Sequence, residues 1–438
     1  MIMGTIIGLT DFGGNGLGVN LVLAAGLLLV TFLYWTWPER LPSSVPGPGR
    51  NIPYLGGLLD LMKNYERLPD YCIDANKLYS GTTWACPMPR VGSIKGACFF
   101  VTTPEGVKHV LKDNFDNYVK GNDTRNALGE FLGDGIFVAD GPQWKFHRKV
   151  ASHMFTNRLL RESARVACLH TARLITALSA ACARSGGSGK SVAVDMQDMY
   201  FRLTIDIFTH IAFGVDLESV SRKDPHPFAV AFDEVQLHSE KRFYNPLWQL
   251  DRLLQWSPGE RAITRSVKVM NEFAKGVIAG RRRTLTALDS ATASTATVAT
   301  EAAEEEEEKE EEEASRLGPD LLSRFLEDAA KKDAADSKDG QGGDGKEKDA
   351  EARTGGSDKE LRDIVLNFMI AGRDTTACAL SWTLFELAKA PAAQAKLRAE
   401  FDAAVPQGVG GGDVSFEAIS SLNYAHAVAL EVAEKRAC

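Results

Sequence analysis

The stretch AGRDTT at residues 371–376 combines residue types that a chemical site needs. Gly372 has no side chain and allows a close approach, and Thr375 and Thr376 offer hydroxyl groups within an otherwise apolar segment. Asp374 adds a charge that apolar packing does not require. We therefore predict a site that needs a close approach and a hydroxyl group. The alternative is a kinked core helix with a solvent-exposed Asp374, since a threonine hydroxyl can bond to the carbonyl one turn earlier.

One long helix has to carry these residues. Apolar side chains recur at helical spacing through residues 360–388, which predicts a single helix. Ser357 or Asp358 can cap its N-terminus, and Pro391 lies just beyond its end. Its middle has a low helix propensity, because glycine alone is about 1 kcal/mol less favourable than alanine.

A second pair of residues is suited to binding a carboxylate. Trp144 and Arg148 are four residues apart in DGPQWKFHRK, so on a helix they share one face. The guanidinium group offers bidentate donors, and the indole ring adds one N–H. The alternative is a surface arginine that packs on a tryptophan.

In this order, the motifs resemble those of the cytochrome P-450 monooxygenases. The run LRDIVLNFMIAGRDTTACALSW resembles the plant and algal branch that hydroxylates fatty acids at or near the ω end. The resemblance implies a mainly α fold with a small β-sheet and a long distal helix. It implies that Asp374 and Thr375 are catalytic and deliver protons to bound oxygen. It places Ala371, Gly372 and Thr376 beside the haem.

The same resemblance assigns Trp144 and Arg148 to a haem propionate. It implies haem (iron protoporphyrin) as the cofactor and an NADPH-dependent cytochrome P-450 reductase as the electron source. The reaction would insert one oxygen atom into a C–H bond of a long apolar substrate, first of all a fatty acid. The aromatic residues within 227–254 can line an apolar tunnel, or they can be ordinary core or membrane-facing side chains.

The resemblance ends near the C-terminal end of the sequence. Glu431 stands at the Glu position of the family's E-x-x-R core pair, but Glu434 occupies the Arg position and would repel a carboxylate. The loop F-x-x-G-x-R-x-C-x-G, whose thiolate binds the haem iron, does not occur in this sequence. Neither Cys378, which lies on the distal helix itself, nor Cys438 is suited to replace that ligand. We therefore expect an incomplete, C-terminally truncated P-450 domain without a protein ligand to the metal.

Two functions follow from this departure. As a family member, the chain would be a monooxygenase of lipid metabolism, although we expect the 438 residues alone to lack thiolate-ligated haem and activity. The alternative is a non-catalytic, membrane-anchored remnant whose acidic tract binds partners. That tract, residues 301–313, holds ten Glu and one Lys, a local charge of −9.

Composition excludes several classes of protein. The chain has a net charge of −8, so the residues outside the acidic tract sum to +1, and no nucleic-acid partner is indicated. At 44% hydrophobic and 25% charged residues, it can build a sizeable core. Seven scattered cysteines without a CxxC pair argue against a cysteine zinc site or a disulfide framework.

The N-terminal region predicts attachment to a membrane. After a tail of residues 1–16, residues 17–37 contain no charge and are long enough to span a bilayer of about 30 Å. Lys and Arg do not precede this segment but follow it. By the positive-inside rule, this places the body of the protein in the cytosol, as for an enzyme anchored in the endoplasmic reticulum. A cleaved signal peptide is the alternative. A Pro/Gly hinge at 38–50 then leads to a P-450-like domain at 51–438.

One low-complexity insert interrupts this domain. Residues 287–356 are rich in Ala, Thr, Glu, Lys, Asp and Gly, which predicts disorder. The Glu-rich part of the insert can instead form an exposed single helix.

Overall fold

The computed structural model describes residues 23–27, 30–31, 41–48, 55–89, 96–152, 157–185, 193–245, 247–295, 322, 358–405 and 414–436. This part of the chain is mainly helical and forms one two-stranded antiparallel sheet, which confirms the predicted mainly α class. The predicted anchor at 17–37 lies outside the described residues except for 23–27 and 30–31, which are helical and exposed.

The elements follow one another in the order α2 (Leu58–Lys63), α3 (Leu68–Leu78), β1 (Trp84–Met88), β2 (Gly96–Phe100), α4 (Pro104–Lys108), α5 (Gly121–Leu132), α6 (Gly141–Ser152), α7 (Asn157–Ser185), α8 (Met196–Phe213), α9 (Pro227–Lys241), α10 (Trp248–Leu254), α11 (Pro258–Thr295), α14 (Asp358–Lys389), α15 (Pro391–Ala404), α16 (Phe416–Ser420) and α17 (Asn423–Arg436). Short 3-10 or π-helical turns lie at Tyr65–Arg67, His109–Asp113 and Phe115–Asn117.

The chain divides into two compact units, and the first contains the sheet. It comprises residues 1–127 and 239–260. Cys86 of β1 pairs with Cys98 of β2 in the antiparallel ladder. Fully buried Trp84 stacks on Phe100 with ring centroids 3.8 Å apart, and this aromatic pair anchors the unit's apolar core.

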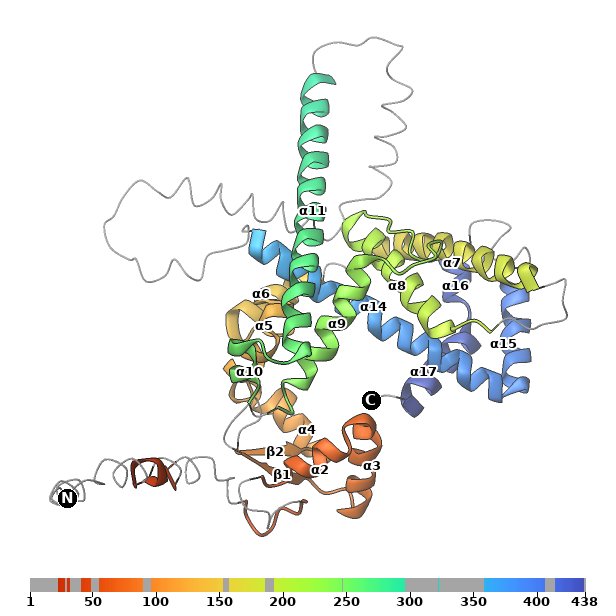
Figure 1. The fold of residues 1–438 in the computed structure, drawn as a ribbon. Coiled ribbons are helices and arrows are strands. Elements are labelled where there is room, and N and C mark those ends of the chain that lie inside the picture. The colour runs from red at the N-terminus through yellow and green to blue at the C-terminus, as the bar shows by residue number, and fades with distance from the viewer. Residues whose placement is uncertain are drawn as a thin grey trace. The chain divides into compact units, whose positions relative to one another are not determined.

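The second unit contains every candidate site residue. It comprises residues 128–238 and 261–438, and its core is built from apolar side chains of α5, α8, α9, α11 and α14. Helix α14 packs along α8, and α15 and α17 contact α14 (Figure 1). Phe228 and Phe232 of α9 belong to this core, so these two aromatic residues serve packing rather than a tunnel.

Two polar side chains of α14 fasten the loop that precedes α6. The Asp363 carboxylate accepts a hydrogen bond from the Asp134 backbone N–H at 2.9 Å. The Asn367 amide accepts from the Phe137 N–H at 3.0 Å and donates to the Leu132 carbonyl at 2.7 Å. Both side chains are almost completely buried, so these bonds satisfy groups that would otherwise be costly in an apolar core.

Glycines in this loop make the fastening possible. A Cβ atom at Gly133, which has φ of +59°, would lie 2.0 Å from the Asp363 carboxylate. A Cβ atom at Gly135 would lie 2.0 Å from the Asn367 amide nitrogen. The Gly-Asp-Gly sequence therefore lets the loop backbone approach α14 closely enough to reach both side chains.

The extent of the insert differs from the prediction. Helix α11 continues to Thr295, nine residues into the segment for which disorder was predicted, and the disorder of the insert stays a prediction. Three alanines within 287–295 favour helix continuation. Of the remaining insert residues, 296–356, the structure describes only Leu322, which is helical and buried in the core of the second unit.

Within the described residues, Leu160–Ala183 of α7 is long and apolar enough to cross a membrane by length and composition alone. This helix packs on α8, and Leu174 joins Leu203 and Val220 in a small buried cluster. We therefore assign α7 to the folded unit.

Replacing Gly135 with alanine should destabilise the second unit by about 1–3 kcal/mol, because the new Cβ overlaps the Asn367 amide. The matched control is Gly129→Ala on α5, where a Cβ meets nothing within 4 Å and helix propensity should raise stability by up to about 1 kcal/mol. Urea unfolding midpoints of the two variants provide the comparison. Equal midpoints would show that the loop is not held against α14 in this way.

Candidate functional site

The middle of α14 presents two contrasting faces. Arg373 and Ala377, four residues apart, are 3% and 0% exposed and face the core. Thr375 and Thr376 lie on another face and are both exposed. The segment predicted to do chemistry therefore combines a buried, fixed side with an open side that carries hydroxyl groups.

Gly372 is the point of close approach on this helix. A Cβ atom there would lie 1.8 Å from the ring of Phe208 on α8. The absence of a side chain therefore lets α8 pack directly against α14 at the level of the threonines. In this structure the small residue serves helix packing, which is a role distinct from the predicted place beside a haem.

The Thr375 hydroxyl donates a hydrogen bond to the Ala371 carbonyl at 2.8 Å. This is the intrahelical bond that the alternative interpretation anticipated. A hydroxyl has one hydrogen and two lone pairs, so the Thr375 oxygen can still accept a bond on its exposed side. Thr376 adds a second hydroxyl next to it, and Ala371 is half-buried.

Arg373 has a structural role that the sequence did not reveal. Its guanidinium group binds both oxygens of Asp233 on α9, at 2.5 and 3.1 Å. It also lies 4.8 Å from the ring centroid of Phe201. A buried cation requires such partners, so this pair links α14 to α9 beside the candidate site.

Asp374 is not solvent-exposed, contrary to the alternative interpretation, because its side chain is only 16% exposed. One oxygen lies 3.2 Å from the guanidinium group of Arg373. Burial raises the pKa of the Asp374 carboxyl, and the neighbouring Arg373 and a hydrogen bond from Gln236 oppose this rise only in part. The carboxyl group therefore holds its proton at a higher pH than an exposed aspartate does.

Trp144 and Arg148 lie on α6 as the spacing predicted. His147 and Ala151 form the buried side of this helix, Trp144 is half-buried and Arg148 is exposed. Arg148 makes no hydrogen bond or ion pair with any residue that the structure describes. Its donors remain available for an acidic ligand.

The loop fastened by α14 also holds the beginning of α6. The Gln143 side chain donates to the Asp134 carbonyl at 3.1 Å, and the Asp134 N–H bonds to Asp363. Sequence reasoning missed Asp363 and Asn367. A signal was present, since the two polar residues are four apart on the apolar side of the predicted helix.

Glu431 lies on the surface of α17 rather than in the core. Its carboxylate pairs with Lys435 at 2.7 Å, and both side chains are more than half exposed. Lys435, the residue after Glu434, is thus the partner of Glu431 here. A role for Glu431 in a buried core pair stays a prediction.

A cavity of about 280 Å³ lies beside Phe201, Asp233 and Arg373, and none of the predicted site residues lines it. Thr375 and Thr376 face outward, and their exposed side is the surface available to a flat cofactor.

The residues of α14 and α6 are chemically suited to one face of a haem and to one of its propionates. Exposed hydroxyl groups at Thr375 and Thr376 suit a distal face, and the unpaired Arg148 with Trp144 suits a propionate. A cysteine facing this side of α14 is not found among the described residues: Cys378 is on α14, Cys168 and Cys182 are on α7, and the others belong to the first unit. Cys438 lies outside the described residues.

Comparison with known proteins identifies a family match. Residues 46–432 match the family model for Cytochrome P450. The chain is 34% identical over 367 residues to cytochrome P450 704B1 of Arabidopsis thaliana, covering 83% of this chain and 60% of the relative. It is 31% identical over 400 residues to cytochrome P450 monooxygenase cyp1 of Mycosarcoma maydis, covering 88% of this chain and 53% of the relative. The chain therefore spans less than two thirds of either relative.

A solved structure supports the same fold. The crystal structure of the cytochrome P450DA heme domain aligns with a TM-score of 0.58 at 18% identity. The alignment covers 89% of this chain and 69% of that one. At this level of identity the likeness concerns the fold alone.

The Asp374→Asn variant should gain stability relative to the parent chain as pH rises from about 4 to 7. The raised pKa means that the folded state binds this proton more tightly than the unfolded state does. That stabilising contribution is present at low pH and is lost as pH rises through the folded-state pKa. Asparagine does not titrate and so avoids the loss.

Melting temperatures measured across this pH range test the expectation. Asp402→Asn on the exposed side of α15 corrects for the removal of one negative charge. A difference between Asp374→Asn and the parent that does not change with pH would contradict the buried environment of Asp374.

Proposed function

Because this chain belongs to the cytochrome P450 family, we propose that it provides the distal side of a haem-dependent monooxygenase. The observation that carries this proposal is the exposed hydroxyl face of α14 at Thr375, beside the buried carboxyl group of Asp374. The name of the Mycosarcoma maydis relative, a monooxygenase, supports the same reaction class.

When bound, a haem supplies the iron that activates molecular oxygen for insertion into a C–H bond. Arg148 and Trp144 hold one propionate through guanidinium and indole N–H donors. They keep their position because Gln143 and Asp134 join the start of α6 to the loop held by α14. The NADPH-dependent cytochrome P-450 reductase supplies electrons in this proposal.

Proton delivery is the role of Asp374 and Thr375. The Asp374 carboxyl is buried and has a raised pKa, so it binds a proton more readily than an exposed aspartate does, which suits a group that exchanges protons. The Thr375 oxygen faces the open side of α14 and accepts a hydrogen bond there, which orients a water molecule or the substrate. Arg373 holds this segment of α14 against α9 through its pair with Asp233.

We propose a long apolar substrate, first of all a fatty acid, on the resemblance of the α14 sequence to the ω-hydroxylating branch. Phe228 and Phe232 are committed to the core, so substrate contacts must come from other residues. We also propose attachment to the endoplasmic reticulum membrane through residues 17–37, with the body in the cytosol. Both points are inferences from the sequence.

Replacing Thr375 with valine should reduce product formed per NADPH consumed by roughly tenfold or more, because the isosteric side chain loses the hydroxyl group. Because we expect the 438 residues alone to be inactive, the assay uses residues 1–436 joined to the part of the Arabidopsis thaliana relative that follows the matched region. The joined protein is loaded with haem and supplied with the reductase and a long-chain fatty acid, and product and NADPH are measured together. Thr383→Val is the matched control, since Thr383 makes the same hydrogen bond, to the Ala379 carbonyl at 2.7 Å, two turns further along α14.

The Thr383→Val variant should couple NADPH to product as the parent does. Equal losses in the two variants would show a general effect on the helix. Unchanged coupling in Thr375→Val would remove Thr375 from the proposed mechanism.

Replacing Arg148 with glutamine should weaken haem binding by about tenfold or more, the effect of losing a charge-assisted hydrogen bond. Absorbance titration of haem into the purified protein measures the change. Lys149→Gln removes the same charge from the adjacent exposed position of α6 and should leave haem affinity within roughly twofold of the parent. Equal weakening in both variants would indicate only a general charge effect.

A further inference from the structure

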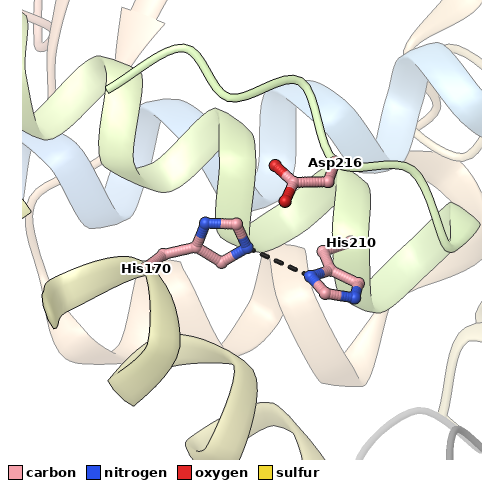
Figure 2. Close-up of side chains that lie close together, drawn as sticks. All are labelled: His170, His210 and Asp216. Carbon is pink, nitrogen blue, oxygen red and sulfur yellow. Dashed lines mark hydrogen bonds between the residues drawn. The ribbon is translucent and has the colours of Figure 1, made fainter. Parts of the chain in front are cut away.

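Two imidazole rings and a carboxylate converge where α7 packs against the end of α8. His170 comes from α7, His210 from the last turn of α8, and Asp216 follows that helix (Figure 2). The Nε2 atom of His170 lies 3.1 Å from the Nδ1 atom of His210. One ligand atom from each of the three residues lies within 4.8 Å of the other two.

The end of α8 creates this convergence. Gly214 ends the helix with a φ of +66°, and its N–H bonds to the His210 carbonyl at 3.0 Å. The chain then turns back, which returns Asp216 to the level of the last helical turn. Fully buried Asp206 fixes the following segment, because its carboxylate accepts from the N–H groups of Ser219 and Val220 at 2.9 and 3.0 Å.

His170 is a buried polar residue that the proposed reaction does not use. The side chain is 0% exposed, and its Nδ1 atom has no hydrogen-bond partner in the structure. Its Nε2 atom points at His210 and into the cluster (Figure 2). A buried imidazole placed this way in an apolar interface calls for a partner beyond the single contact to His210.

The distances suit a transition-metal ion. Two nitrogen ligands bound to Zn²⁺ at about 2.0–2.1 Å in tetrahedral geometry lie about 3.3 Å apart. The separation of 3.1 Å between the two imidazole nitrogens is close to this value. Asp216 has to move by up to about 1.5 Å to complete the set, because the ligand atoms lie within 4.8 Å of one another. Its exposed position after α8 permits this movement.

Asp216 is oriented for such a role by its own partners. One oxygen binds Arg173 at 2.5 Å, and the other accepts from the Glu218 N–H at 3.0 Å. A carboxylate has about four lone-pair sites, so it can keep these bonds and ligate an ion. Hydrogen bonds to the ligands are the usual way in which proteins orient metal-binding side chains.

The surrounding charges favour a cation overall. The carboxylates that act on the two imidazoles are Asp206, Asp216 and Glu162, and the guanidinium groups are Arg165 and Arg173, so the local charge is −1. Burial lowers the pKa of both His170 and His210, which favours the neutral rings that metal ligands require.

We propose that His170, His210 and Asp216 form a Zn²⁺ site that fastens α7 to the end of α8. The two facing nitrogens share one proton in the metal-free protein, and coordination moves that proton to a remote ring nitrogen. The fourth position on the ion is left to water. Since α8 packs along α14, the bound ion stabilises the helix that supports Gly372.

The first experiment uses the tag-free 438-residue chain dialysed against Zn²⁺. We expect one Zn²⁺ per chain by mass spectrometry of the metal and a higher melting temperature than in the chelator-treated protein. X-ray absorption at the zinc edge should show nitrogen and oxygen ligands at about 2.0–2.1 Å with imidazole scattering. Sulfur at about 2.3 Å would instead place the ion on cysteines and overturn the proposal.

Variants test the assignment of the ligands. His210→Asn and Asp216→Asn should each weaken Zn²⁺ binding by roughly 100-fold in calorimetric titration, since losing a ligand has at least the effect of losing a residue that hydrogen-bonds to a ligand. His226→Asn is the control, because this histidine bonds to the Phe228 N–H outside the cluster. Binding that survives both variants, or a parent chain without stoichiometric Zn²⁺, would overturn the site and leave a hydrogen-bonded imidazole pair. The parent measurements decide this even where a variant fails to fold.

Discussion

Buried polar groups on an apolar helix must find partners, and in this protein that constraint organises the second unit. Asp363 and Asn367 are almost fully buried on α14 and bind backbone groups of the loop at 132–137, and Asp363 also accepts a hydrogen bond from Arg362 at 2.8 Å. Satisfying these groups requires glycines at 133 and 135, since a side chain would occupy the same space. The position of α6, and of Arg148 on it, follows from this fastening.

The same constraint applies again on this helix six residues after Asn367. Arg373 is buried, and its guanidinium group is satisfied by Asp233 of α9. This pair fixes one face of α14, so the opposite face with Thr375 stays open without loss of order. Asp374 lies between the two faces and has a raised pKa because it is largely buried. Structural support and proposed proton chemistry are therefore contributed by adjacent residues.

Local patterns in the sequence predicted the features that depend on residues close together in the chain, such as helices and the residues that share a helix face. The long helix, predicted at 360–388, runs over Asp358–Lys389, and Trp144 and Arg148 lie on the same helix, α6, where a spacing of four residues places them on one face. The pairs that join distant segments were not predictable in this way. Arg373 and Asp233 are 140 residues apart and His170 and His210 are 40 apart, and helical periodicity carries no information about which distant side chains meet. The exposure of Thr375 and the burial of Asp374 likewise depend on packing by other helices.

The central claim is that α14 and α6 present the distal face and the propionate clamp of a haem site. The most direct measurement is the reduced, carbon monoxide-bound absorption spectrum of residues 1–436 joined to the part of the Arabidopsis thaliana relative that follows the matched region. We predict the red-shifted Soret band of thiolate-ligated haem from the joined protein, weakened by Arg148→Gln. A folded joined protein that takes up no haem would contradict the account. So would a Soret band whose intensity is unchanged by Arg148→Gln.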